Sequence, residues 1–349
     1  MATRRPRDPA FSRRTLLAGG AAAGLGLALG ACGSDDGSAP GTGAAVTPAP
    51  GTAFPVRVPH KFGTTTVRAA PKRVASVGGG DVDTLLALGI VPLVVPDIEP
   101  SWKADGGGVG PWSRPLLRGA EPTVVSSQEI GFEQIAAARP DLVSAVEFDL
   151  KRSDYDKLSD LAATIAPPKG FAAYTVPWDT MALQVGRSVG RLAAARKLVA
   201  TARAQRTQAG RDNPAFARAR TILVDPDDAG GVYVFAPGDV RSRFLEDIGL
   251  QPPAAVDSLF GEQFYAQISA ERLDILDESD LIILVGSNTG PTKALLATRV
   301  WTQLKNVKSG RLVTITEPDL AIAMSYSSVL STPYQLERLV PRVRRALAA

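Results

Sequence analysis

The side chains that most often carry chemistry are scarce in this chain of 349 residues. It contains one cysteine, Cys32, and one histidine, His60. These counts exclude a disulfide framework, a cysteine-based zinc site and a multi-histidine metal site. His60 follows Pro59 near a predicted hairpin, and we expect it at the surface rather than on a metal. No Walker, GxGxxG or GxSxG sequence occurs, so we predict neither a catalytic residue nor a metal ligand.

Cys32 ends an apolar segment whose sequence suits modification of its thiol. Ser12-Arg13-Arg14 precedes an apolar run from Leu16 to Ala31, which is too short and too glycine-rich for a confident membrane-spanning helix. Basic residues before a short apolar run are typical of an export signal, and paired arginines favour the twin-arginine route. Gly30 and Ala31, directly before Cys32, resemble a bacterial lipobox, in which the thiol receives a diacylglyceryl group. Two acyl chains would anchor the protein firmly to a membrane.

The segment after Cys32 has the composition of a linker. Residues 33–53 are Gly, Ala, Ser, Thr, Pro and Asp, with Val46 as the exception, and cannot form a core. We predict a twin-arginine-like lipoprotein signal peptide over 1–31 and a flexible, lipid-anchored tether over 32–53. The folded body would then work at the extracytoplasmic face of the cell membrane, in contact with it through the lipid alone.

The net charge of +4 is concentrated at the N-terminus. Residues 1–31 hold five arginines and one aspartate, and the rest of the chain balances 34 basic residues against 34 acidic residues. The body therefore has no bulk electrostatic attraction for DNA or RNA, and we expect no nucleic-acid partner.

From Phe54 onward, short apolar runs alternate with helical patterns. This alternation predicts an α/β fold with parallel sheets covered by helices. We expect strands at 56–58, 64–67, 74–77, 90–95, 142–146, 221–224, 232–235, 281–285 and 312–315, and helices at 82–88, 132–138, 155–161, 241–248 and 332–347. Asp81 is a suitable N-cap for the first of these helices. The Gly78–Gly80 loop before it fits a tight turn, or a phosphate cradle made of backbone N–H groups.

The longest helical pattern lies in the middle of the chain. Apolar residues recur at helical spacing over 179–208, a length that could connect two lobes. We predict an N-terminal α/β lobe over 54–178, a connecting helix over 179–211 and a C-terminal α/β lobe over 212–349. An internal echo supports two lobes, because Glu133 before Asp141-Leu142-Val143 resembles Glu271 before Asp280-Leu281-Ile282.

Aromatic residues in loops are the candidate ligand contacts. Trp102, Trp112, Trp178 and Tyr326 all stand in Pro-, Gly- or Ser-rich surroundings. Loops at the carboxyl ends of parallel strands are where open α/β sheets bind ligands. We therefore expect these four side chains to line a cleft between the lobes, with charge supplied by Arg114, Arg241 and Arg243.

From Phe54 to its end the chain resembles the iron–siderophore substrate-binding lipoproteins of ABC importers, the ferric-citrate- and ferrichrome-binding type. The resemblance spans roughly 290 residues behind a lipobox. It is carried, in this order, by Ala70-Pro71-Lys72-Arg73-Val74, Asp83-Thr84-Leu85-Leu86-Ala87-Leu88-Gly89-Ile90-Val91-Pro92, Phe132-Glu133-Gln134-Ile135, Arg139-Pro140-Asp141-Leu142-Val143, Val176-Pro177-Trp178, Arg243-Phe244-Leu245-Glu246-Asp247-Ile248-Gly249-Leu250 and Ser331-Thr332-Pro333-Tyr334-Gln335-Leu336.

The resemblance implies two Rossmann-like lobes joined by one long rigid helix, with the ligand in the cleft between them. It implies a ferric siderophore as ligand, with iron already chelated and no cofactor of the protein's own. Bare-metal carriers of this fold use several histidines, which this chain lacks. By position, Glu133 and Glu271 resemble the two glutamates that meet arginines of the permease, so an ABC permease and its ATPase are the expected partners of a monomer.

Three alternatives remain open from the sequence. The same fold could bind another bulky ligand, such as haem or cobalamin. A surface-anchored α/β enzyme would need a clustered set of acids or histidines. A scaffold lipoprotein would have no cavity between its lobes.

Overall fold

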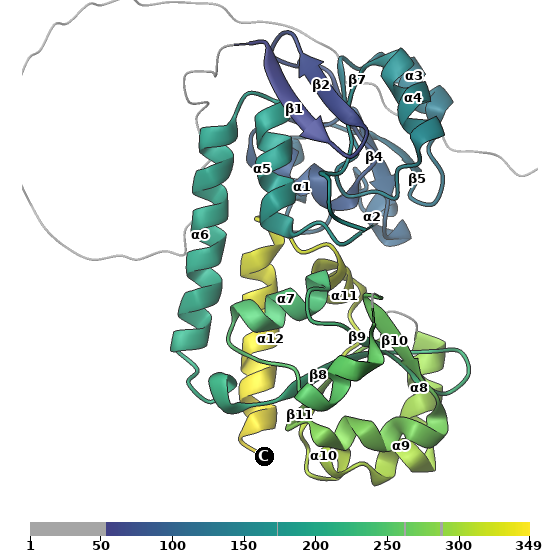
Figure 1. The fold of residues 1–349 in the computed structure, drawn as a ribbon, viewed down its shortest axis with the longest axis vertical. Coiled ribbons are helices and arrows are strands. Elements are labelled where there is room, and N and C mark those ends of the chain that lie inside the picture. Colours follow the sequence, from purple (N-terminus) through teal and green to yellow (C-terminus); the bar gives the residue numbers. More distant parts are fainter. Residues whose placement is uncertain (1–53, 173, 262, 287–288) are drawn as a thin grey trace, which may run out of the picture. The chain divides into compact units, whose positions relative to one another are not determined.

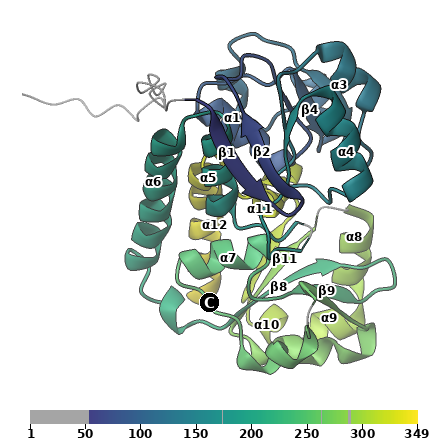
Figure 2. The same ribbon diagram turned by 45° about the horizontal axis from the view of Figure 1, so that its top comes forward.

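The structure is a computed structural model that describes residues 54–172, 174–261, 263–286 and 289–349. The predicted signal peptide, Cys32 and the tether lie outside the described residues. Two five-stranded sheets with flanking helices form the described part of the chain (Figures 1 and 2). The predicted α/β fold with two lobes is confirmed, and we call them the N-terminal and C-terminal lobes. No helix in these ranges is long and apolar enough to cross a membrane.

A two-stranded hairpin opens the N-terminal lobe. Strands β1 (Val56–His60) and β2 (Gly63–Val67) pair antiparallel, as predicted. Alternation along β1 places His60 on the same buried face as Val56 and Val58. Its Nε2 lies 2.9 Å from Thr65 Oγ1, and burial lowers the pKa of the ring. The expectation of a surface histidine is therefore wrong.

The sheet of the N-terminal lobe is entirely parallel, in the order β5-β4-β3-β6-β7. Val74 and Leu142 pack on one face, towards the hairpin and the helix that begins at Trp178, whereas Ala75 and Val143 pack on the other. The elements of this lobe are β3 (Val74–Ser76), α1 (Gly79–Ala87), β4 (Val94–Asp97), α2 (Pro100–Ala104), η1 (Arg114–Leu117), β5 (Thr123–Ser126), α3 (Phe132–Ala138), β6 (Leu142–Ser144), α4 (Arg152–Leu161) and β7 (Ala163–Ile165).

The sheet of the C-terminal lobe is mixed, in the order β10-β9-β8-β11-β12. β8, β11 and β12 are parallel, and β9 pairs antiparallel with both β8 and β10. Its elements are η2 (Phe216–Arg218), β8 (Thr221–Pro226), β9 (Val232–Phe235), α7 (Val240–Asp247), η3 (Ala254–Leu259), β10 (Tyr265–Ile268), η4 (Ala270–Glu278), β11 (Leu281–Val285), α8 (Thr289–Ala297), α9 (Arg299–Gln303), α10 (Lys305–Lys308), β12 (Leu312–Ile315), α11 (Pro318–Ser325) and α12 (Ser331–Leu347).

The internal echo corresponds to a repeated hydrogen-bond pattern. In the N-terminal lobe, the carboxylate of Asp141 before β6 accepts from the backbone N–H of Arg73 before β3 at 3.0 Å. In the C-terminal lobe, Asp280 before β11 accepts from the N–H of Arg220 before β8 at 2.8 Å. Each aspartate also donates its own N–H to the carbonyl of that arginine. The same pair of hydrogen bonds thus links the central strand of each sheet, β3 or β8, to its neighbour, β6 or β11.

The connection between the lobes differs from the single helix predicted over 179–211. It consists of α5 (Trp178–Ser188) and α6 (Leu192–Arg211), and the prediction of one continuous helix is wrong. Gly190 breaks it with φ = +69°, a left-handed conformation that glycine adopts without strain. A Cβ at that position would lie 2.7 Å from the ring of Phe54. α6 alone forms the long rod at the edge of the molecule in Figure 1.

Candidate functional site

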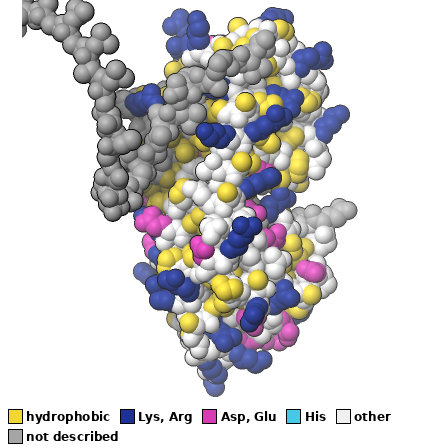
Figure 3. Space-filling model, turned by 90° about the vertical axis from the view of Figure 1, so that its left-hand side faces the viewer, with side chains coloured by type: hydrophobic (Ala, Val, Ile, Leu, Met, Phe, Trp, Pro, Cys, Tyr) yellow, Lys and Arg dark blue, Asp and Glu magenta, His cyan; other side chains and the backbone are white. Residues whose placement is uncertain are grey.

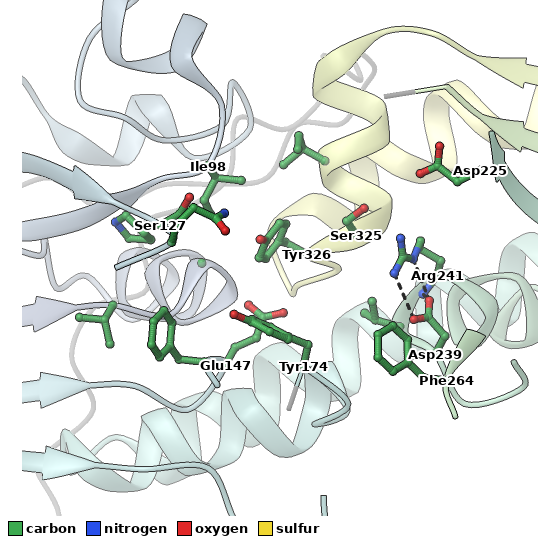
Figure 4. Close-up of a pocket in the computed structure, with 17 residues that line it drawn as sticks. Ile98, Ser127, Glu147, Tyr174, Asp225, Asp239, Arg241, Phe264, Ser325 and Tyr326 are labelled. Carbon is green, nitrogen blue, oxygen red and sulfur yellow. Dashed lines mark hydrogen bonds and ion pairs between the residues drawn. The ribbon is translucent and has the colours of Figure 1, made fainter. Parts of the chain in front are cut away.

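A cavity of about 410 Å³ lies between the carboxyl ends of the two sheets. From the N-terminal lobe it is lined by residues that include Ile98, Ser127, Glu147, Phe148 and Tyr174. From the C-terminal lobe it is lined by residues that include Asp225, Asp239, Arg241, Phe264, Ser325 and Tyr326 (Figure 4). Ile98 follows the end of β4 and Ser127 follows the end of β5, which is the edge at which open α/β sheets bind ligands.

Four aromatic side chains give the cavity flat apolar walls. Tyr326 follows α11, and Figure 4 shows it in the middle of the cavity with Tyr174 nearby. Phe148 lies on the N-terminal wall and Phe264 on the C-terminal wall. Burial raises the pKa of the Tyr326 hydroxyl to about 12, so the group stays protonated and can donate a hydrogen bond to a ligand oxygen. Such a surface suits a bulky ligand with an apolar body and oxygen atoms at fixed points.

Glu147 joins the cavity wall to the first turn of α1. Its Oε2 accepts a hydrogen bond from Gly80 N–H at 2.5 Å, and its side chain is buried. This carboxyl occupies the helix N-terminus that a phosphate would need, so the Gly78–Gly80 turn is held by the protein itself. Asp81 is not the N-cap that we predicted, because α1 begins at Gly79 with Gly78 before it. Asp81 instead accepts from Ser144 Oγ at 2.7 Å, which ties α1 to β6.

The protonation of Glu147 makes stability depend on pH. Burial, with nearby Asp81 and Asp83, raises the pKa of Glu147 to about 8, although the hydrogen bond from Gly80 opposes this. The folded protein then holds a proton that the unfolded chain loses above its ordinary pKa of 4.5. Stability therefore falls as pH rises through that window, from about 4.5 to about 8. Glu147→Gln cannot ionise, so we expect its melting temperature to fall less over this range than that of the wild type.

Thermal melts of both proteins at about pH 5 and about pH 8 check this prediction. The substitution should reduce the slope rather than remove it, because burial also raises the pKa values of Asp81 and Asp83. Equal slopes in wild type and Glu147→Gln would contradict the assignment of the proton to Glu147.

Arg241 and Asp239 form a closed ion pair at the C-terminal wall. Arg241 Nε donates to Asp239 Oδ1 at 2.8 Å, and Nη2 donates to Oδ2 at 3.2 Å. Asp239 is also the N-cap of α7, since its side chain accepts from the backbone N–H of Arg241. The guanidinium lies over the ring of Phe235, 3.7 Å from the centroid. Its charge is thus already neutralised and its position fixed.

Two of the sequence-predicted ligand contacts, Tyr326 and Arg241, line the cavity, and two tryptophans lie just behind it. Trp102 and Trp112 meet edge to face at 5.4 Å between ring centroids. Trp102 Nε1 donates to Asp319 at 2.6 Å, and Trp112 Nε1 donates to Asp83 at 2.7 Å. They border a small hollow of about 20 Å³ that shares Tyr326 with the main cavity. The Trp102–Asp319 hydrogen bond therefore links the two lobes, whereas the Trp112–Asp83 hydrogen bond lies within the N-terminal lobe.

The remaining three predicted contacts lie elsewhere. Arg114 forms an ion pair with Asp105 at 3.4 Å. Trp178 is buried in the first turn of α5, and Arg243 donates to the carbonyl of Gly238. Trp178 and Arg243 border a separate polar cavity of about 370 Å³. The structure therefore does not bring Arg114, Trp178 or Arg243 into the cavity between the sheets.

The sequence analysis did not select Glu147, Phe148, Tyr174 or Phe264. Glu147 and Phe148 directly follow the strand predicted over 142–146, and this position is the signal that could have identified them. Tyr174 lies just upstream of Trp178 in a Gly- and Pro-containing loop. Phe264 carries no comparable signal, because it lies just before a strand that we did not predict, β10.

Glu133 and Glu271 occupy equivalent places in the two lobes. Glu133 is exposed in the first turn of α3, which precedes β6, and Glu271 is exposed in the first turn of η4, which precedes β11. Hydrogen bonds from its own backbone N–H and from Ser269 lower the pKa of Glu271. Neither side chain lines the cavity, and both are exposed to solvent.

The described residues show neither a metal-binding cluster nor, on the face in Figure 3, a basic patch. No group of three or more His, Cys, Asp and Glu side chains among them could hold a metal ion. Figure 3 shows the face that carries α6, where described lysines and arginines are scattered among acidic and apolar side chains rather than gathered in one basic patch.

The chain is similar to known binding proteins. A family model described as "Periplasmic binding protein" matches residues 74–318. A protein of Bacillus subtilis (strain 168), named as an ABC transporter substrate-binding lipoprotein, YhfQ, is 24% identical over 302 residues, which are 83% of this chain and 90% of that protein.

Three solved structures have a similar fold. A periplasmic solute binding protein from Mycobacterium smegmatis is 33% identical, with a TM-score of 0.74 over 84% of this chain and 98% of the other. PiaA of Streptococcus pneumoniae, solved with ferrichrome, is 23% identical, with a TM-score of 0.72 over 84% of this chain and 99% of the other. SirA of Staphylococcus aureus, solved with staphyloferrin B, is 18% identical, with a TM-score of 0.68 over 82% of this chain and 98% of the other.

Proposed function

The chain belongs to the periplasmic binding protein family and is a substrate-binding protein of an ABC transporter, and from this premise we propose that its substrate is a ferric siderophore. It binds this substrate without transforming it. The observation that carries the proposal is the aromatic-lined cavity of about 410 Å³ between the carboxyl ends of the two sheets. With one histidine and one cysteine in the whole chain, iron would arrive already chelated and would be recognised through the chelator.

The cavity matches the needs of such a ligand. A ferric chelate presents an apolar outer shell interrupted by oxygen atoms. Tyr174, Tyr326, Phe148 and Phe264 offer ring faces to the shell, and the protonated Tyr326 hydroxyl offers a donor to an oxygen. Similar folds in PiaA and SirA were solved with ferrichrome and staphyloferrin B, which supports a siderophore for this chain as well.

A titration of tryptophan fluorescence tests the proposal. Trp102 and Trp112 lie behind the cavity wall and serve as internal reporters. We expect saturable quenching by at least one ferric siderophore, with Kd at or below about 1 μM, which corresponds to roughly 8 kcal/mol of binding free energy. Haem and cobalamin belong in the same panel. Quenching by one of these two alone would overturn the siderophore and keep the fold.

Cys32, outside the described residues, carries the proposed attachment to the membrane. A diacylglyceryl thioether on Cys32 would hold the protein at the extracytoplasmic face of the cell membrane, and the rest of the chain would stay in water. We expect Cys32→Ala to move the protein from the membrane fraction to the soluble extracytoplasmic fraction. Ser34→Ala is the matched control and should stay with the membrane. Membrane retention of Cys32→Ala at the wild-type level would contradict a lipid anchor at this residue.

Delivery of the ligand requires contact with a permease. We propose that Glu133 and Glu271, one on each lobe, contact basic residues of an ABC permease whose ATPase drives import. Their equivalent places before β6 and β11 support this, because a permease with two similar halves would meet both lobes in the same way. The protein would work in this complex as a monomer.

A further inference from the structure

Acidic side chains outnumber basic ones among the described residues that line the cavity between the sheets. Among the described residues that line it, the titratable carboxyls are Glu147, Asp225 and Asp239, and the base is Arg241 (Figure 4). The acids come from both walls, since Glu147 follows β6 and Asp225 lies in β8. A ligand held between the walls is therefore near carboxyls on two sides.

Arg241 does not offset this excess for a ligand. Both oxygens of Asp239 already accept from its guanidinium, and Asp239 is 4% exposed. An anionic ligand that approached Arg241 would have to displace this carboxylate or share the guanidinium with it. Displacement would leave Asp239 buried and unpaired, which is strongly unfavourable. The ion pair thus acts against anions rather than for them.

Glu147 leads to the same conclusion in either protonation state. When protonated, it is a neutral hydrogen-bond donor, and when ionised, it adds a negative charge to the N-terminal wall. Neither state supplies a positive charge to an anion. The faces of Tyr174 and Tyr326 beside it attract cations through their ring quadrupoles.

We propose that this cavity selects ferric siderophores of zero or positive net charge, of which ferric trihydroxamates are the natural class, and discriminates against anionic ferric chelates. Three singly charged hydroxamates neutralise ferric iron, whereas three doubly charged catecholates leave a trianionic complex. Among the described residues that line the cavity, the base Arg241 is already paired with Asp239, so a trianionic complex would leave the water and find no available cation to compensate its charge. This cost is an effective source of specificity. This inference rests on the proposed function, because it names the class of siderophore that the same cavity binds.

The test uses one linear ferric trihydroxamate in three charge states. The free amine form carries a terminal ammonium, the N-acetyl derivative is neutral, and the N-succinyl derivative carries a carboxylate. We expect the ammonium and acetyl forms to bind at least about tenfold more tightly than the succinyl form, equivalent to about 1.4 kcal/mol. Higher salt should reduce this difference in affinity, because salt screens the charge of the ligand. Succinyl binding as tight as that of the other two would overturn the inference.

A substitution at the ion pair gives an independent readout. Asp239→Asn keeps an N-cap side chain on α7 and frees Arg241. We expect the succinyl form to bind several-fold more tightly to this variant, and the ammonium form more weakly. Asp257→Asn, an exposed acid of η3 outside the cavity, is the matched control and should change neither. If the ratio of the succinyl-form affinity to the ammonium-form affinity is the same in Asp239→Asn as in the wild type, the role of the ion pair is overturned.

Failure of the proposed function is a separate outcome. If none of the three forms binds, while haem or cobalamin does, the siderophore itself is wrong and the inference fails with it. If all three bind with equal affinity, the siderophore stands and only the charge selection fails.

Discussion

Replacing Glu133 and Glu271 together by arginine is expected to abolish uptake of the ferric siderophore by cells while leaving its affinity for the protein unchanged. Both glutamates are exposed and lie outside the cavity, so their replacement changes no contact to the ligand. Like charges brought together across an interface cost several kcal/mol, which is enough to lower uptake at least about tenfold. Uptake of radioactive iron by cells and the fluorescence titration measure the two quantities separately.

The control for the Glu133/Glu271 variant is a second pair of Glu→Arg substitutions, which changes the net charge by the same amount. Glu121→Arg and Glu278→Arg change two other exposed acids, one in each lobe, and η4 carries both Glu278 and Glu271. We expect near-normal uptake in this control. Lost ligand affinity in the Glu133/Glu271 variant would place these residues in the binding site or the fold, and normal uptake would exclude them from the permease contact.

The second large effect is expected on stability, from Arg206 in α6. Its side chain is buried and contacts elements of both lobes. The guanidinium carbon lies 4.3 Å from the ring centroid of Trp178 in α5 and 5.0 Å from that of Phe244 in α7. It also forms an ion pair with Asp247 at 2.9 Å. Desolvation lowers the pKa of Arg206 to about 10, so the group is charged at neutral pH.

Arg206 also forms hydrogen bonds with residues at and just before the start of α12. Arg206 Nη2 donates to Ser327 Oγ at 2.8 Å and to Thr332 Oγ1 at 2.7 Å. Both hydroxyls are buried, so removal of the guanidinium leaves them without this partner. Asp247 is 40% exposed, and water screens its charge, so most of the cost comes from the buried hydroxyls and the lost packing.

Arg206→Met is expected to lower the free energy of unfolding by about 3 kcal/mol, and the melting temperature by roughly 5–10 °C. Arg203→Met is the matched control on the same helix. Arg203 pairs with Asp179 but its side chain is 61% exposed, so its loss should cost less than about 1 kcal/mol. Equal melting temperatures for the two variants would contradict the role of Arg206 in holding α6 against α5, α7 and the start of α12.

The elements that sequence patterns predicted are those whose pattern reports burial. Alternation in β1 and unbroken apolar runs such as β11 follow from the face or faces that must avoid water. The same patterns could not reveal the break at Gly190, because apolar spacing continues from Val185 through Val199 across it. At the break, the ring of Phe54, more than a hundred residues away in the chain, packs where a side chain at 190 would lie.

The site was predictable to a smaller extent, for a physical reason. The sequence placed Tyr326 in a loop before the last predicted helix and Arg241 at the start of another predicted helix, and both residues line the cavity. Such a position does not indicate which way a side chain points, and large indoles tend to be buried. Trp102 and Trp178 are accordingly buried against other protein groups. Glu147 acquires its role from Gly80, which is 67 residues away, and no local pattern records that contact.

Binding of a ferric siderophore between the two sheets is tested most directly by a calorimetric titration of wild type and Ser127→Trp with the neutral ferric trihydroxamate. Ser127 lines the cavity just after β5, and an indole there would fill part of the space without entering the core. Ser127→Ala is the control, and the melting temperatures of all three proteins should agree within about 2 °C. We predict one-to-one binding by wild type and Ser127→Ala, and affinity at least about a hundredfold weaker in Ser127→Trp, a loss of about 2.7 kcal/mol. Undiminished binding by Ser127→Trp, or no binding of any ferric siderophore by the wild type, would contradict binding of a ferric siderophore between the two sheets.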